Sequence, residues 1–164
     1  MKSLLTSFWL LLAAAWLLGT GGCSKQDPVA ASGTQPVKHE HKAPHGGTPV
    51  VLGNEAYHLE LVRDAATGTL QAFVLDGEME NFIRTNAPAV EITAIINGAP
   101  QTLTLKPVAN AATGETVGDT SLFETRADWL KTTSQFDATV KSITIRGTTF
   151  TDVKFNFPKG NDKD

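Results

Sequence analysis

From residue 48 to residue 158 the chain alternates short apolar runs with turn-forming residues, and this pattern restricts the fold more than any other feature. The runs are rich in β-branched and aromatic side chains. Several of them alternate apolar with polar residues, as in YHLELV at residues 57–62. Both properties are typical of β-strands with one buried face. We therefore expect about seven or eight strands in this part of the chain.

The connections between the runs carry the chemistry of tight turns. Residues 64–68 (DAATG) and 110–114 (NAATG) are near copies, each starting with a side chain that caps a turn and ending in Gly. Asn97-Gly98 is the strongest two-residue hairpin signal, and Asp76-Gly77 and Arg146-Gly147 mark further turns. Short strands joined in this way favour an all-β fold, an antiparallel β-sandwich of immunoglobulin-like size, with a small β-barrel as the alternative.

Only residues 126–136 (RADWLKTTSQF) resemble a helix, about two turns long, and they could equally form an irregular crossover. The chain has a single cysteine, so the domain must be held together by apolar burial. The expected core consists of the large apolar residues of the strands and of this segment: Leu59, Leu61, Phe73, Leu75, Val90, Ile92, Ile95, Leu103, Leu105, Phe123, Trp129, Ile143, Ile145, Phe150, Val153 and Phe155.

The N-terminus has the layout of a secretory signal peptide: one Lys, an apolar run from Leu4 to Leu18, small residues, and then Cys23. A cysteine directly after TGG resembles a bacterial lipobox, although Thr20 stands where Leu is usual. The resemblance implies cleavage before Cys23 and lipidation of that residue. The alternative is an ordinary secreted protein with one unpaired thiol, which would be prone to oxidation outside the cytosol.

This interpretation divides the chain into four parts. We expect a lipoprotein signal peptide over residues 1–22, lipidated Cys23 with a flexible, His-containing tether to residue 47, a β domain over 48–158, and a disordered tail over 159–164. The tether is predicted because residues 24–47 contain Ser, Gly, Pro, Gln and charged residues but almost no large apolar side chain.

The lipid anchor makes the membrane the expected partner of Cys23, since several acyl chains bind effectively permanently. Ser24 follows the cysteine where an Asp would favour the inner membrane, so we expect the outer membrane, facing the periplasm. The formal net charge is −3 and becomes −4 when Lys2 leaves with the signal peptide. An acidic chain lacks the basic stripe that nucleic acid requires, so nucleic acid is excluded as a partner.

Nothing in the sequence indicates an enzyme. There is no Gly-x-Ser-x-Gly motif and no Gly-rich phosphate loop, and lipidation would remove the only thiol as a nucleophile. Asp76, Glu78 and Glu80 place three carboxylates close together, but they fall at a strand end and in a loop, where acidic side chains are usually solvated. We therefore predict a binding protein without catalytic residues.

The histidines are the candidate metal ligands, because neutral imidazole is a common ligand of borderline metals. His39 and His41 are two residues apart, so in an extended segment they point the same way. The same period places His58 and Glu60 on one face of a strand. The alternative is that His39 and His41 are ordinary polar residues of a tether and that His58 faces solvent.

His45 lies just before the first expected strand, next to two glycines. If the first two strands form a hairpin, His45 returns to the far end of the second strand and not to His58. That arrangement speaks against a simple His45–His58 site. Pairing of the first strand with a different neighbour would remove the objection.

Residues 38–85, with HGG, YHLELV and the pattern G-x-L-x-A-x-V-L-D, resemble small bacterial lipoproteins and segments associated with heavy-metal efflux adaptor proteins. The resemblance implies an envelope protein of transition-metal handling, with His45 and His58 at matching positions and a metal-efflux or other envelope protein as partner. Imidazole and carboxylate ligands suit Zn, Ni, Co or Cu(II). The expected function is a lipid-anchored metal carrier, buffer or efflux accessory; the alternative is a structural or interaction lipoprotein with incidental histidines.

Overall fold

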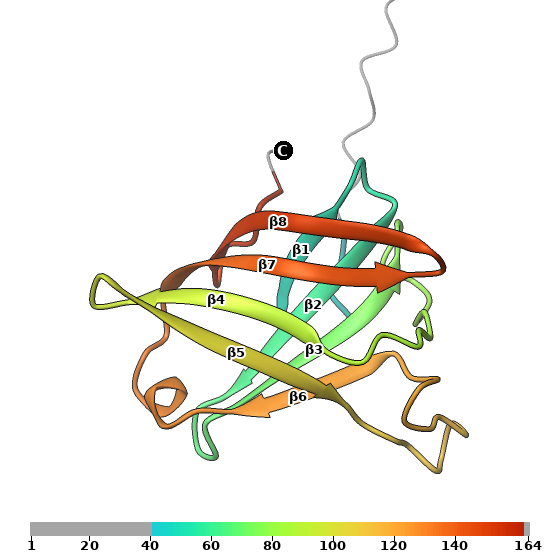
Figure 1. Ribbon diagram of the computed structural model, residues 1–164, viewed down its shortest axis with the longest axis horizontal. Helices are drawn as coiled ribbons and strands as arrows, with labels where there is room; N and C mark the ends of the chain where they lie inside the picture. Colours follow the sequence, from blue (N-terminus) through green and yellow to red (C-terminus); the bar gives the residue numbers. More distant parts are fainter. Residues whose placement is uncertain (1–40, 163–164) are drawn as a thin grey trace, which may run out of the picture. The chain divides into compact units, whose positions relative to one another are not determined.

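The computed structural model describes residues 41–162 (Figure 1), in which eight antiparallel strands form one nearly closed, barrel-like sheet. Residues 1–40 and 163–164 lie outside the description, and with them the predicted signal peptide, Cys23 and His39. The strands are β1 (Thr48–Leu52), β2 (Tyr57–Asp64), β3 (Thr69–Asp76), β4 (Val90–Ile96), β5 (Ala99–Pro107), β6 (Leu122–Arg126), β7 (Phe136–Ile145) and β8 (Thr148–Phe157). Among residues 41–162, no helix is long and apolar enough to cross a membrane.

The strand order is β1-β2-β3-β6-β5-β4-β7-β8, and every neighbouring pair is antiparallel. Strand β8 passes close to β1, so the two edges of the sheet approach each other. The all-β prediction is confirmed. Of the two architectures considered, the small barrel describes the molecule, because all eight strands belong to a single sheet that encloses the core.

The turn residues behave as their chemistry predicts. In the β2–β3 hairpin the Asp64 carboxylate accepts hydrogen bonds from Ala66 N (2.8 Å) and Thr67 Oγ1 (2.6 Å). Asn97 and Gly98 between β4 and β5 both have positive φ, 52° and 78°. A two-residue hairpin turn with positive φ at both positions matches the twist of the flanking strands, which explains the Asn-Gly pair.

The core lies on the inner face of the curved sheet and is mostly the predicted one. Some predicted core residues lie outside this core, because successive side chains of a strand point to opposite faces of the sheet. In β3 the inward residues are Leu70, Ala72 and Val74, so Phe73 and Leu75 lie on the outer face. In β4 the inward residues include Ile92, and Ile95 is 46% exposed because it has the opposite parity.

The predicted helix is shorter than the sequence suggests. Residues Asp128–Lys131 form one 3-10 turn, labelled η1, with Leu130 buried and Trp129 packed edge-on against Phe136 at a centroid distance of 5.2 Å. Arg63 Nε donates to the carbonyl oxygen of Leu130. The segment is thus a crossover between β6 and β7 that covers one end of the barrel.

Residues 159–162, expected as part of a disordered tail, are tied to the free edge of β1. Asn161 Oδ1 accepts a hydrogen bond from Val51 N at 2.7 Å, and Asn161 Nδ2 donates to Val51 O at 3.1 Å. The side-chain amide therefore pairs with the backbone of β1 as a neighbouring strand would. Exposed strand edges promote aggregation, so this cover protects the edge at the gap in the barrel.

Candidate metal-binding site

Residues 41–47, which the composition predicts as the end of the flexible tether, pack against the outer face of β2; we call them the strap. Their contact with the sheet is centred on Glu60. This carboxylate is fully buried, and Oε1 accepts hydrogen bonds from His45 N (2.7 Å) and Gly47 N (2.9 Å). Oε2 lies 2.8 Å from Nδ1 of His45. A buried carboxylate is costly unless it is paired, and these three bonds, which we call the Glu60 clamp, satisfy it.

The strap follows β2 closely because Gly47 has no side chain. A Cβ atom at Gly47 would lie 2.7 Å from the carbonyl oxygen of Leu61 and 2.8 Å from Cγ of Glu60. Both distances are shorter than real Cβ contacts, so any other residue would push the strap away from the strand. The glycine and the carboxylate together fix the position of residues 45–47.

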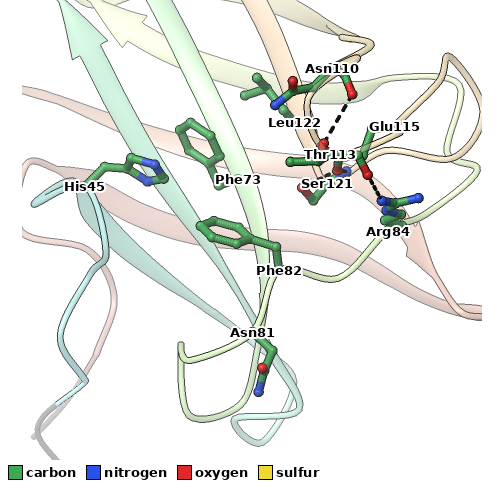
Figure 2. A pocket seen from close by; sticks show the side chains of 10 residues that line it. All are labelled: His45, Phe73, Asn81, Phe82, Arg84, Asn110, Thr113, Glu115, Ser121 and Leu122. Atoms are coloured by element: carbon green, nitrogen blue, oxygen red, sulfur yellow. Dashed lines mark hydrogen bonds between the residues drawn. The ribbon is translucent and has the colours of Figure 1, made fainter.

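His45 lies against Glu60, in the middle of β2, and not beside His58. The imidazole of His45 stacks on Phe73 with a centroid distance of 4.0 Å and an interplanar angle of 19°, and it lies 5.7 Å from the ring of Phe82 (Figure 2). The reason is the β1–β2 hairpin, in which Pro49 faces Glu60 and Val51 faces His58. Because the hairpin forms, the sequence-based objection to a simple His45–His58 site applies.

His58 and Glu60 share the outer face of β2, as their spacing predicts, but neither faces solvent. The exposed fraction of His58 is zero. Its Nδ1 lies 3.2 Å from the carbonyl oxygen of Asp76, and because a carbonyl can only accept, Nδ1 carries the proton in this contact. The Nε2 atom is buried and has no hydrogen-bond partner among the described residues.

Burial lowers the pKa of His58 below its ordinary value of 6.5. The hydrogen bond to the Asp76 carbonyl opposes this shift, and the neighbouring His41 adds to it. The neutral form, with a lone pair on Nε2, is therefore the form that the fold favours. An imidazole with one nitrogen fixed by a backbone carbonyl and the other free is the usual state of a metal-ligating histidine.

His41, at the start of the strap, supplies a second imidazole. Its ring centroid lies 4.8 Å from that of His58, with an interplanar angle of 41°. With a metal–nitrogen distance of about 2.0–2.1 Å, two imidazoles on one ion place their centroids roughly 4.5–5.2 Å apart. The spacing of His41 and His58 thus fits two ligands of one metal ion.

The predicted ligands are therefore divided between two places. His41 and His58 form one pair, whereas His45 and Glu60 are engaged with each other in the clamp. Across residues 41–162, no three His, Cys, Asp or Glu side chains gather closely enough to hold a metal. His39, two residues before His41, lies outside the described residues.

The burial of the site was not expected from the sequence, although a signal for it exists. The outer face of this part of the sheet carries Val51, Phe73 and Leu75 on the strands that flank His58 and Glu60. Apolar side chains on both faces of a strand indicate that both faces are covered. Read in this way, the pattern YHLELV next to TLQAFVLD points to a second covering layer over β2.

Comparisons of the chain with protein-family models, with curated proteins and with solved structures found no match.

Proposed function

We propose that this protein is a lipid-anchored protein of the bacterial cell envelope that binds a divalent transition metal ion through His41 and His58, as a carrier, buffer or efflux accessory. One observation carries the proposal: the buried Nε2 of His58, without a partner among the described residues, beside a second imidazole at 4.8 Å. A buried polar atom left unpaired costs about 1–3 kcal/mol, and a metal ion would satisfy it.

The donor set defines the class of metal. Two neutral imidazoles suit Zn²⁺, Ni²⁺, Co²⁺ or Cu²⁺, whereas Cu⁺ prefers thiolate and thioether ligands. Two protein ligands leave further coordination positions for water, for His39 or for a ligand from a partner. Such an open site favours exchange of the ion over permanent retention, which is the behaviour expected of a carrier or buffer.

Calorimetric titration of the full chain with Zn²⁺, Ni²⁺ and Cu²⁺ tests the proposal. We expect micromolar or tighter binding for at least one ion, and a loss of about tenfold or more in His41→Ala, since each imidazole is a direct ligand. Lys42→Ala is the matched control, because this exposed residue of the strap belongs neither to the imidazole pair nor to the clamp. Nitrogen NMR of His58 gives a second readout, since metal binding shifts the Nε2 resonance and leaves Nδ1 protonated.

No binding tighter than millimolar in the native chain would overturn the proposal. So would an affinity that is unchanged when His39 and His41 are both replaced by Ala. His58→Gln separates ligand loss from loss of the strap: metal binding should fall while the amide of Gly47 remains protected from hydrogen exchange.

The rival function is an envelope interaction module in which the histidines are incidental. An open cavity beside the exposed ring of Phe82 favours this alternative. The same titrations separate the two, because the interaction module requires no metal affinity.

A further inference from the structure

A cavity of about 420 Å³ opens next to the strap, between β3 and the loop that precedes β6. Its volume lies within the range of small-molecule sites, about 300–1,000 Å³. One wall is aromatic and consists of His45, Phe73 and Phe82; the facing wall is polar and includes Arg84, Asn110 and Glu115 (Figure 2). The cavity is distinct from the His41–His58 pair, since neither residue lines it.

The aromatic wall is held rigidly even though it faces solvent. The loop that carries Phe82 is fixed by Asp76, whose Oδ1 accepts hydrogen bonds from Glu80 N (2.9 Å) and Asn81 N (3.2 Å). Met79 anchors the same loop, being 2% exposed and held at a φ of 57°. Phe82 nevertheless remains 47% exposed. A large apolar ring presented by an ordered loop is available for contact with a ligand.

The polar wall is equally well built. Glu115 is almost completely buried, and its carboxylate accepts hydrogen bonds from Ser121 N (2.8 Å), Ser121 Oγ (2.7 Å) and Thr113 Oγ1 (2.7 Å). Although burial alone would raise the pKa of Glu115, these hydrogen bonds and the charge of Arg84 lower it, so the group is ionised. The lining thus contains one anion and one cation, and the site has no net preference for a charged ligand.

Two polar groups of this wall remain available. Asn110 Oδ1 accepts a hydrogen bond from Ala112 N, but Asn110 Nδ2 has no partner among the described residues. Arg84 uses its terminal nitrogens for Thr113 O and Asp119, whereas its Nε makes no hydrogen bond within residues 41–162. A purely apolar ligand would remove water from these donors without replacing it, at a cost in affinity.

From the two walls together we infer that the cavity binds an uncharged sugar, one pyranose ring or a disaccharide. The apolar C–H face of a pyranose packs against the rings of Phe73 and Phe82, and its hydroxyl groups pair with the amide of Asn110 and the guanidinium of Arg84. An uncharged ligand matches the balanced charge of Arg84 and Glu115. The inference does not rest on metal binding, because it uses a different set of residues.

Saturation-transfer NMR on the full chain, in a detergent without a sugar head group, tests the inference. The probes are glucose, galactose, mannose, N-acetylglucosamine and their β-linked disaccharides, with N-acetylphenylalanine amide as an aromatic peptide probe. We expect at least one sugar to bind with a Kd of about 1 mM or tighter. Phe82→Ala should weaken that binding about tenfold, because it removes one of the two ring faces.

Ile95→Ala is the matched control, since Ile95 is also about half exposed, lies on β4 and does not line the cavity. It should bind the sugar as the native chain does. The inference is overturned if no sugar receives saturation, if only the aromatic peptide probe binds, or if Phe82→Ala and Ile95→Ala bind equally well. Addition of Zn²⁺ or a chelator serves as a cross-check, and the sugar affinity should be the same with either.

Discussion

On the inner face of β2, Leu59 and Leu61 are buried in the apolar core, whereas on the outer face His58 and Glu60 are equally buried beneath the strap. The inner side chains need only to be apolar and of the right size. Glu60 needs three hydrogen-bond donors in particular positions, and it has them. Nε2 of His58, by contrast, has no hydrogen-bond partner in the described part of the chain. The buried side chains of the inner face therefore mainly stabilise the fold, whereas those of the outer face place particular hydrogen-bonding groups.

The largest effect is expected on the inner face. Leu59→Ala should lower the free energy of unfolding by about 2–5 kcal/mol, because it leaves a cavity in a closed core. Chemical denaturation of the full chain measures this loss. A loss below about 1 kcal/mol would mean that the barrel interior can collapse around the missing atoms.

On the outer face, Glu60→Ala should cost less, about 1–3 kcal/mol, since the strap can detach and its amides can regain hydrogen bonds to water. Hydrogen exchange at the amides of His45 and Gly47 should accelerate strongly. Glu60→Gln is the matched control: its side-chain carbonyl can still accept from both amides, so exchange should remain slow. Slow exchange in Glu60→Ala would show that the clamp does not hold the strap.

At the edge of the sheet, Asn161→Ala should cost about 0.5–1.5 kcal/mol, the usual range for a hydrogen-bonded side chain. The amide of Val51, which now donates to Asn161, should exchange faster. Asn156→Ala offers a comparison, because its side chain donates to the exposed Asp137 and should matter less. Equal effects of the two changes would argue against a role of Asn161 as edge cover.

The smallest effect on stability is expected from a change of pH, because only one side chain is involved. The folded chain holds His58 with a pKa below 6.5, so on acidification the unfolded chain takes up this proton first. Stability due to neutral His58 is complete above pH 6.5 and is lost as the pH falls from there towards the lower folded pKa. Unfolding free energies measured between about pH 7.5 and 5 should show this slope, and His58→Gln should reduce it. A slope unchanged in that variant would assign it to other groups.

The strands, the hairpin turns and the shared face of His58 and Glu60 follow from local rules, a period of two and the conformations that Gly and Asn allow. The place of His45 follows from the same rules once β1 and β2 form a hairpin. By contrast, β6 follows β5 in the chain but also pairs with β3, across the intervening β4 and β5, and no local pattern specifies that second pairing.

The strap could not be predicted because its composition is that of a disordered segment. Its order depends on the carboxylate of Glu60, distant in sequence, and on Gly47, which has no room for a side chain. The mean hydropathy of the segment reflects neither interaction. The cavity likewise depends on the approach of residues 81–84 to residues 110–122, which are brought together only by the closed sheet.

The Glu60 clamp also has a mechanical consequence. Tension applied to the chain before His41 acts on the strap first, and the three hydrogen bonds of Glu60 resist it ahead of any pair of strands. Their rupture would release residues 41–47, about 23–25 Å of extended chain at roughly 3.3–3.6 Å per residue. The same event would carry His41 away from His58. The Glu60 carboxylate thus determines both the length of free chain before the domain and whether the imidazoles of His41 and His58 face each other.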